Sequence, residues 1–408
     1  MADERVLGEV GHDVYYDPFD FDIDNDPYPV WKRLRDEEPL YYNENYGFYA
    51  LTRHEDVSAG LQNWDTFRSG KGTILDVLLS GMQIPPGLVL FEDPPAHDVH
   101  RRMLSRVFTP RRMAAIEPLA RRFTVAALDS LTERGGFDFI THLGAWMPMR
   151  TIGTLLGIPD DDQATLRDNT DKYLELNQTE HASRVEPGQA LAIPSYGHIG
   201  EYVDWREKNP SEDLMTDLIY AEVEKADGVS RRLTRDEVLT FISTIMGAGS
   251  ETTTRLIGFA GQLLGDNADA RREVARDPSL IPAAVEEVLR YEAPSPVQGR
   301  YVEHDTVHHG QTVPSRSIML LVNGAANRDD RKYPDPDRFD IHRSPNSHLS
   351  FGQGLHFCLG AALARMEARV ALEEVLKRWP DWTVDHDRAR RAHTSSVRGW
   401  ASLPVEVG

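Results

Sequence analysis

The only cysteine of the chain, Cys358, lies in a glycine-rich segment directly ahead of a stretch with helical spacing. This segment, from Phe351 to Gly360, reads FGQGLHFCLG. Glycines permit turns that other residues resist, and the amide N–H groups at the start of a helix favour a thiolate over a neutral thiol. A lone cysteine is more commonly buried and unreactive, but the glycine pattern argues against that interpretation. The segment therefore indicates a single sulfur that can bind iron.

A second unusual segment, IMGAGSETTT from Ile245 to Thr254, lies within an apolar helical run from about residue 235 to 264. Its glycines and its adjacent Glu251 and Thr252 cost helix stability, because glycine loses backbone entropy and threonine can bond back to the carbonyl four residues earlier. A helix weakened in this way suggests a ligand lying against it. Close packing of small residues between two helices is the alternative.

Two further pairs of side chains lie on single helix faces. Glu287 and Arg290 are three residues apart and can form an ion pair, as many exposed helical residues do. His97 and Arg101 are four residues apart and could donate to an anion. Each pair alone is equally compatible with an ordinary solvated helix surface. The histidines His304, His308 and His309 are interpreted as turn and strand residues, since no further ligand recurs at metal-binding spacing.

The elements that must position these residues are predicted from periodicity and from proline and glycine stops. Helical patterns dominate, so the predicted class is α+β, mostly α, with a small antiparallel part. The predictions are a helix over 29–37, a hairpin of strands 40–42 and 48–51, a helix over 55–63, mostly helices over 96–291, short strands over 295–322, a helix over 358–378 and weak strands at the end.

Composition excludes several classes of protein. The 408 residues carry 45 basic and 65 acidic side chains, a net charge of −20 that disfavours nucleic acid and anionic membranes as partners. One cysteine allows neither an internal disulfide nor a multi-cysteine zinc site. Neither a signal-peptide core nor a membrane-spanning apolar stretch is found. A cytoplasmic, monomeric protein without a membrane anchor is expected, with one domain over residues 1–408.

The cysteine segment resembles the cysteine loop of the cytochrome P450 family, the haem-thiolate monooxygenases. Every fixed position of the family pattern F-G-x-G-x-H-x-C-x-G is matched, although Ala362 stands where many members carry proline. The glycine-containing helix resembles the motif A-G-x-[DE]-T. Glu287 and Arg290, followed by Arg338, resemble E-x-x-R with its downstream arginine. All motifs occur in family order along nearly the whole chain, which implies the family's triangular single domain with a long central helix.

The resemblance also implies a role for each matched residue. Cys358 would bind the iron of haem b, while Ala248 and Gly249 would form a groove for O₂ and Glu251 and Thr252 would deliver protons. Glu287, Arg290 and Arg338 would form a buried structural triad rather than act in catalysis. The remaining residues expected to contact haem are His97, Arg101, Arg300 and His356 at the propionates and Phe351, Gly352 and Gly360 in the cysteine loop.

The segment before His97 is strongly apolar and rich in glycine and proline. An exposed loop of this composition would be adhesive, so its side chains must cover something, either the protein's own core or a ligand. In the family this segment covers the substrate pocket. The expected pocket residues are Leu78, Leu79, Met82, Leu88, Val89, Phe241, Ile245, Val297 and Val397.

The implied reaction is insertion of one oxygen atom of O₂ into an apolar small molecule of lipid, terpenoid, steroid or natural-product type. Electrons would come from NAD(P)H through a reductase and a ferredoxin, because the chain has no Gly-rich dinucleotide fingerprint. The arginine-rich segment from His100 to Arg122 is the expected docking site, with Arg102, Arg106 and Arg112 as contacts. A peroxide-driven peroxygenase and a non-catalytic haem-binding sensor are the alternatives.

Overall fold

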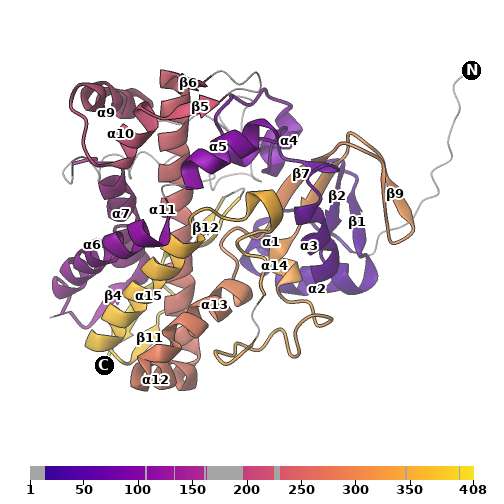
Figure 1. Ribbon diagram of the computed structural model, residues 1–408. Coiled ribbons are helices and arrows are strands. Elements are labelled where there is room, and N and C mark those ends of the chain that lie inside the picture. Colours follow the sequence, from indigo (N-terminus) through magenta and orange to yellow (C-terminus); the bar gives the residue numbers. More distant parts are fainter. Residues whose placement is uncertain are drawn as a thin grey trace, which may run out of the picture.

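The computed structural model describes residues 14–105, 108–132, 134–159, 162, 196–224, 230–344, 347–394 and 396–408. Helices gather around the long central helix α11, and a mixed sheet lies to one side of them (Figure 1). The α-helices are α1 (Phe21–Asn25), α2 (Tyr28–Glu37), α3 (His54–Gln62), α4 (Leu75–Ser80), α5 (Ala96–Ser105), α6 (Pro110–Asp129), α7 (Met147–Leu155), α9 (Tyr196–Lys208), α10 (Leu214–Ile219), α11 (Arg235–Asp266), α12 (Ala268–Arg276), α13 (Ile281–Tyr291), α14 (Asn323–Ala326) and α15 (Ala361–Arg378).

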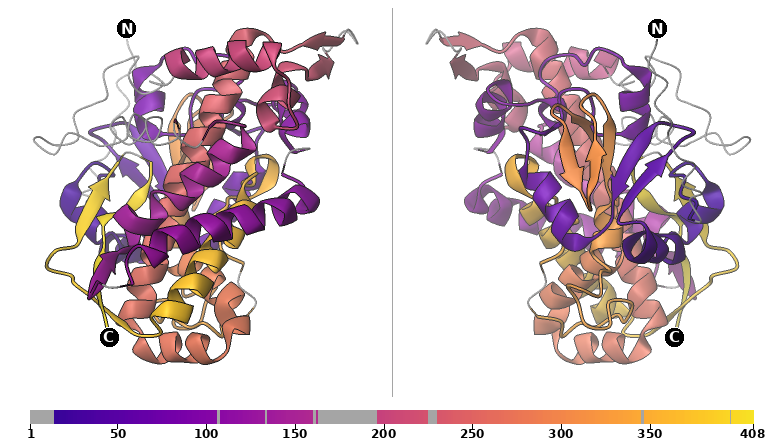
Figure 2. Two further views of the ribbon diagram at one scale, coloured as in Figure 1. Left: turned by 90° about the vertical axis from the view of Figure 1, so that its left-hand side faces the viewer. Right: turned by 90° about the vertical axis from the view of Figure 1, so that its right-hand side faces the viewer.

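The strands form one larger sheet and several small ones, and the larger sheet faces the viewer in the right-hand panel of Figure 2. They are β1 (Leu40–Asn43), β2 (Phe48–Leu51), β3 (Phe67–Arg68), β4 (Gly136–Asp138), β5 (Glu222–Glu224), β6 (Ser230–Arg232), β7 (Gln298–Val302), β8 (Thr306–His308), β9 (Gln311–Val313), β10 (Ile318–Leu321), β11 (Trp382–Val384), β12 (Arg390–His393), β13 (Arg398–Ser402) and β14 (Pro404–Val407).

The larger sheet has the order β1-β2-β10-β7-β3. The predicted hairpin is confirmed, with Leu40 opposite Leu51 and Asn43 opposite Phe48. β10 pairs with β2 in parallel, whereas its pairing with β7 is antiparallel. The predicted class, mostly helical with a small and largely antiparallel part, is therefore confirmed, and β2–β10 is the parallel exception.

Helix α11 spans the molecule and begins at a capping box. The Thr234 hydroxyl accepts from the Glu237 amide, and the Glu237 carboxylate accepts from the Thr234 amide. Each group satisfies a backbone donor that would otherwise lack a partner, so the start of the helix is fixed. The sequence predicted this helix to within about two residues. Most of its side chains are buried, so the helix forms the centre of the main core.

Glycines allow other elements to approach α11 closely. A Cβ atom at Gly261 would lie 2.6 Å from the ring of Phe139, and one at Gly258 would lie 2.5 Å from Ile140 Cδ1. Both neighbours belong to the π-helix η2 (Phe139–Gly144), which contacts α11 directly. Close packing at small residues is therefore found at Gly258 and Gly261, which lie after the segment from Ile245 to Thr254 for which it was the alternative interpretation.

Candidate active site

The cysteine loop is closed by its own backbone. Gly352 and Gly354 have φ angles of +67° and +70°, which side-chain-bearing residues rarely adopt. The amide of Cys358 donates to the carbonyl of Phe351 at 2.8 Å, so the two ends of the loop meet. The loop contains the short 3-10 helix η4 (Gly354–His356), and Gly360 is the N-cap of α15. The helix thus begins three residues after Cys358, whereas the sequence predicted that it begins at Cys358.

The surroundings of the Cys358 sulfur act on its protonation in opposite directions. Burial raises the pKa of the thiol. The backbone N–H of Gly360 and the guanidinium groups of Arg101 and Arg365 lower it. The amide expected from sequence is therefore present, but burial has the larger effect on the pKa. A metal cation is the partner that would overcome burial, because a coordinating thiol is deprotonated.

Four polar side chains expected at the propionates meet beside this loop. His97 is 1% exposed and its ring centroid lies 4.5 Å from that of His356. The Arg101 guanidinium donates to the Phe357 carbonyl. Burial, followed by the nearby charges of Arg300, His97 and Arg101, lowers the pKa of His356 to about 3. The structure thus brings His97, Arg101, Arg300 and His356 together.

The donors of this cluster fit an anionic group. The Nε2 atoms of His97 and His356 are buried and have no hydrogen-bond partner within the described part of the chain. Arg300 is 4% exposed, and its guanidinium donates to the carbonyl of Gly299. Buried polar atoms without partners cost free energy, and carboxylates would accept from all of these donors. The residues present therefore fit a cofactor with carboxylate groups, as haem has.

Helix α5 connects this cluster to α11 through a pair that sequence reasoning missed. His100 Nδ1 lies 2.7 Å from Glu92 Oε2, and the His100 ring packs edge-on against Phe241 with centroids 5.2 Å apart. The other Glu92 oxygen accepts from the Gly87 amide at 2.8 Å. The buried Glu92 carboxylate thus ties the apolar loop to α5. Only the i, i+3 spacing of His100 from the identified His97 could have drawn attention to it.

One stripe of α11 differs from the rest of this buried helix. Ala248 is exposed, and Thr244 and Thr252, one turn to either side, are partly exposed. The Thr252 hydroxyl donates to the Ala248 carbonyl at 2.9 Å. An open stripe along a central helix marks a space in which a ligand can lie against the helix. The structure therefore places Thr252 and Ala248 on one face, as expected.

The other two predicted residues of this motif lie elsewhere. A Cβ atom at Gly249 would lie 2.9 Å from Ile152 Cδ1, so the missing side chain lets α7 approach α11 closely, and the glycine itself is partly exposed. Glu251 is buried and forms an ion pair with Arg255 at 3.3 Å. Gly249 and Glu251 thus lie on other faces of the helix than Ala248 and Thr252, and the groove expected at Ala248 and Gly249 stays a prediction.

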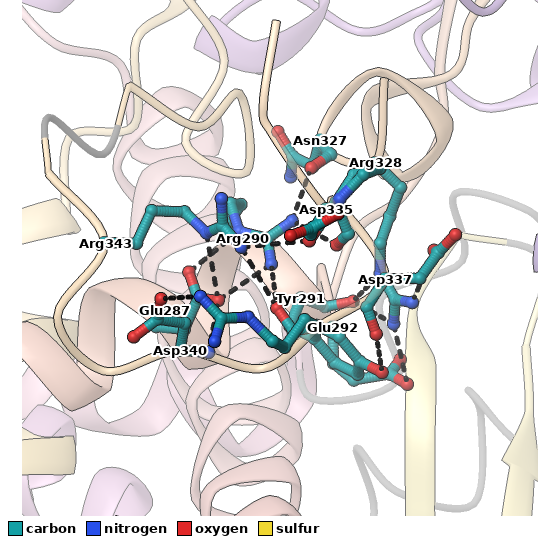
Figure 3. Close-up of polar contacts among 12 residues, drawn as sticks. Glu287, Arg290, Tyr291, Glu292, Asn327, Arg328, Asp335, Asp337, Asp340 and Arg343 are labelled. Carbon is teal, nitrogen blue, oxygen red and sulfur yellow. Dashed lines mark hydrogen bonds and ion pairs between the residues drawn. The ribbon is translucent and has the colours of Figure 1, made fainter. Parts of the chain in front are cut away.

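The buried structural triad contains a different arginine from the one predicted (Figure 3). Arg290 and Glu287, 0% and 1% exposed, form two hydrogen bonds at 2.8 and 2.7 Å. The guanidinium that approaches Glu287 is that of Arg343, at 3.3 Å. The Arg338 side chain is 66% exposed and pairs with Asp340. Arg338 contributes only its carbonyl, which accepts from Arg290, so the prediction for its side chain is wrong.

The predicted pocket residues do not all lie in one place in the structure. Val297 and Val397 line one pocket together with Ile74 and Leu75. Leu79 packs in the same cluster as Val297, and Leu78 lies against Gly299 of β7. Val89 and Ile245 belong to the main core, Leu88 is 4% exposed, and Met82 is partly exposed.

Phe241 is 0% exposed, so its prediction as a pocket wall is wrong. Its ring is covered by His100 and by the surrounding core, which leaves no surface for a ligand.

One of the arginines predicted to dock a partner forms an ion pair within the protein. Arg102 is exposed, whereas Arg112 forms an ion pair with Asp217 at 2.7 Å and both partners are nearly half exposed. Arg106 lies outside the described residues. Phe357, directly before Cys358, is 43% exposed and was not predicted. A large exposed aromatic side chain beside a site is typical of an interface.

Among the described residues, no helix combines the length and the apolar character that a membrane span requires.

Comparisons with known proteins agree in one family. The model of the family "Cytochrome P450" matches residues 164–399. "Putative cytochrome P450 123" of Mycobacterium tuberculosis is 38% identical over 393 residues, 96% of each chain. Two solved structures cover 94–96% of this chain and 97–98% of their own: cytochrome P450 CYP109Q5 from Chondromyces apiculatus, at 32% identity and a TM-score of 0.84, and a mutant of P450 EryK in complex with erythromycin B, at 33% and 0.85.

Proposed function

The chain belongs to the cytochrome P450 family of monooxygenases, and from this premise we propose that it binds haem b through the sulfur of Cys358. The observation that carries the proposal is the cluster of His97, Arg101, Arg300 and His356 beside the cysteine loop, with two buried imidazole nitrogens lacking partners. These four side chains would hold the two propionates. Phe351, Gly352 and Gly360 would frame the cofactor, because their backbone forms the loop that ends at the sulfur.

Haem ligated by a thiolate supplies the activation of O₂, so that one oxygen atom enters the substrate and the other leaves as water. The protein's own task is to supply protons and to exclude bulk water. Thr252 is suited to the first task, because its hydroxyl lies on the open stripe of α11 and is fixed by its bond to Ala248. Glu251, one residue earlier, forms an ion pair with Arg255. Its carboxylate would leave Arg255, take up a proton and carry it inward.

The exchange of Thr252 for alanine tests this role. In Thr252→Ala, we expect the yield of product per NADPH consumed to fall about tenfold, because a positioned proton donor typically contributes a factor of this size or more. Reducing equivalents would instead appear as peroxide. Product, NADPH consumption and peroxide are measured together in the reconstituted system.

Two variants control for changes in packing. Thr252→Ser keeps a hydroxyl and should keep most of the yield. Thr244→Ala removes a hydroxyl two turns earlier that also bonds to a helix carbonyl, at 2.7 Å to Thr240, and should leave the yield unchanged. An equal loss in both alanine variants would show that these hydroxyls act only through the packing or local geometry of the helix.

We further propose that the substrate is apolar and of lipid, terpenoid, steroid or natural-product size. Leu78, Leu79, Val297 and Val397 present apolar surface near β7 and its neighbours. Burial of such surface contributes about 25 cal/mol per Å², so only a ligand with several hundred Å² of apolar area would gain several kcal/mol before ordering costs. The similarity to P450 EryK, crystallised with erythromycin B, supports a large natural product.

Displacement of iron-bound water, followed in the Soret region, tests this substrate class. Fatty acids, steroids, terpenes and macrolides form one set of ligands, and sugars and amino acids form the opposing set. We expect saturable shifts from the first set. Tight shifts from the polar set alone would show that the substrate is not apolar.

The electrons would come from NAD(P)H through a reductase and a ferredoxin, and the ferredoxin would bind the surface of exposed Arg102 and Phe357 beside the cysteine loop. Phe357 directly precedes Cys358 in the chain, and a short path between the surface and the iron ligand would favour electron transfer. We also propose that the chain is a monomeric, cytoplasmic protein with a single haem domain over residues 1–408, in accord with a main core that runs from Leu104 to Val405.

Charge reversal tests the docking surface. For Arg102→Glu, alone or with Arg106→Glu, we expect the rate of reduction by an acidic ferredoxin to fall about tenfold at low ionic strength, because steering by complementary charge is lost. Arg112→Glu should have a smaller effect, since Arg112 is already paired with Asp217. Stopped-flow reduction under CO measures the rate. Arg276→Glu, at an exposed position at the end of α12, is the control and should behave as the wild type.

Reduction rates that change neither with ionic strength nor with the Arg102 substitution would contradict the proposed docking surface. Turnover with hydrogen peroxide that equals turnover with the complete electron-transfer system would contradict the need for a ferredoxin.

A further inference from the structure

A second pocket lies apart from the propionate cluster, where the N-terminal segment meets the end of α11 and the hairpin of β12 and β13. It shares no lining residue with the cysteine loop or with the open stripe of α11. The lining residues are Asn25, Asp26, Tyr28, Gln262, Leu263, Asp266, Asn267, Tyr291, Glu292, Arg328, Arg391 and Arg398.

Two of its three arginines are fully engaged with protein groups. Arg328 donates to the Tyr291 carbonyl at 2.9 and 3.0 Å and to Asp337 at 3.1 Å, and its guanidinium lies over the rings of Tyr28 and Tyr291. Arg398 forms an ion pair with Glu292 and donates to the carbonyls of Asp24 and Asn25. Each of the three guanidinium nitrogens of both residues already donates to a protein acceptor.

Arg391 is different. It lies opposite Trp400 in the β12–β13 pairing, and its guanidinium carbon is 3.8 Å from the centroid of the Trp400 ring. Its guanidinium makes no hydrogen bond or ion pair with any described residue, and its Nη1 atom is buried. Burial and the charge of Arg398 lower its pKa to about 10, which still leaves it charged at neutral pH. Arg391 as a whole is partly exposed, but a buried donor such as this Nη1 atom without a hydrogen-bond partner is costly.

Among the described residues, Glu292 and Asp24 are close enough to act on the charge of Arg391, but no carboxylate forms a hydrogen bond or an ion pair with it. Glu292 already accepts from the Tyr28 hydroxyl at 2.6 Å and from Arg398. Asp266 is exposed and pairs with His386 at 2.8 Å, and Asp26 is exposed to solvent. Asp24, whose charge also reaches Arg391, pairs with His393 at 2.7 Å. The lining of the pocket therefore includes a guanidinium with a buried donor atom, Nη1, that has no acceptor among the described residues.

We propose that this pocket binds a small oxyanion, a carboxylate or a phosphate, through the guanidinium of Arg391. The planar fork of arginine donors matches two oxygens of either group. Stacking on Trp400 fixes the plane of the fork without using its donors. Gln262 supports the same ligand: its Oε1 accepts from Trp400 Nε1 at 2.9 Å, which orients the amide, and its Nε2 has only a long contact of 3.4 Å with Asp266.

Binding of inorganic phosphate and of acetate to the haem-loaded protein tests the site. Equilibrium dialysis with labelled probe gives the stoichiometry and Kd, and thermal unfolding at constant ionic strength gives an independent readout. We expect one saturable site per chain for at least one probe. Arg391→Gln should weaken it at least tenfold, and Arg391→Lys should weaken it less, because the charge stays while the fork is lost.

Arg390→Gln is the matched control, since Arg390 is the exposed neighbour of Arg391 on the same strand. It should bind the probes as the wild type does. An unchanged Soret spectrum shows that each variant is folded, and if Arg391→Gln fails this check, Arg391→Lys alone decides. The proposal is overturned if neither probe binds saturably to the wild type, or if binding is the same in the Arg391 and Arg390 variants.

Discussion

Replacement of Cys358 by serine abolishes monooxygenase activity and the thiolate signature in the reduced-CO spectrum, if the chain uses its only sulfhydryl as iron ligand. The structure gives two reasons for so complete an effect. No second cysteine exists to take over, and the loop is closed by the bond between the Cys358 amide and the Phe351 carbonyl. A serine hydroxyl fits the same place but donates far less electron density than a thiolate.

The measurement is the reduced-CO difference spectrum, taken with NADPH-dependent oxygen consumption in the presence of a ferredoxin and its reductase. Gln353→Ala is the control, because Gln353 lies in the same loop but bonds outward, to Ser58 and Gln62. It should keep both the thiolate signature and the activity. A serine variant that retained the thiolate band would overturn the assignment of Cys358.

The second large effect is on stability, and it separates two arginines five residues apart. In Arg343→Ala, we expect a loss of about 1–3 kcal/mol in the free energy of unfolding, because its half-buried contacts with Glu287 and with the carbonyls of Pro334 and Asp335 disappear. In Glu287→Ala the loss should reach about 3–5 kcal/mol, since Arg290 would remain as a buried charge without its carboxylate.

Arg338→Ala is the matched comparison and should cost no more than about 0.5 kcal/mol, because its side chain is mostly exposed and a surface ion pair contributes little. Chemical unfolding of the haem-loaded variants, followed by circular dichroism and Soret absorbance, measures these free energies. We expect the loss to be largest in Glu287→Ala, smaller in Arg343→Ala and smallest in Arg338→Ala. A larger loss for Arg338 than for Arg343 would show that the sequence-based triad is correct and that the network in Figure 3 is not.

The elements that carry the site could be predicted from sequence, because their signals are local. The central helix has a capping box and a long apolar run, and α15 follows a glycine-defined start, so both were predicted to within a few residues. The propionate cluster could be predicted only from the family resemblance. Its members come from α5, β7 and the cysteine loop, and no periodicity in the sequence relates these three elements.

The errors share a physical origin. Spacing indicates which residues are near one another along an element, but the direction of a side chain depends on what packs against it. Arg338 occupies the expected position yet offers only its carbonyl to Arg290, while Arg343 reaches back to Glu287. Phe241 lies on the predicted helix, but its ring is enclosed by His100 and the core. Glu92 acts through a loop–helix contact with His100 that no helical or strand pattern could predict.

The parallel pairing of β2 with β10 has a consequence for how the protein folds while it is synthesised on the ribosome. Leu51 and Leu321 are partners in the finished sheet, yet 270 residues separate them in the chain. At roughly 5–20 residues per second, the inner edge of β2 waits on the order of 10–60 s for its neighbour to be synthesised. During that interval the unpaired N–H and C=O groups of this apolar strand can template aggregation. Slower expression at lower temperature, or added chaperone, should therefore raise the soluble yield more than changes of the surface would.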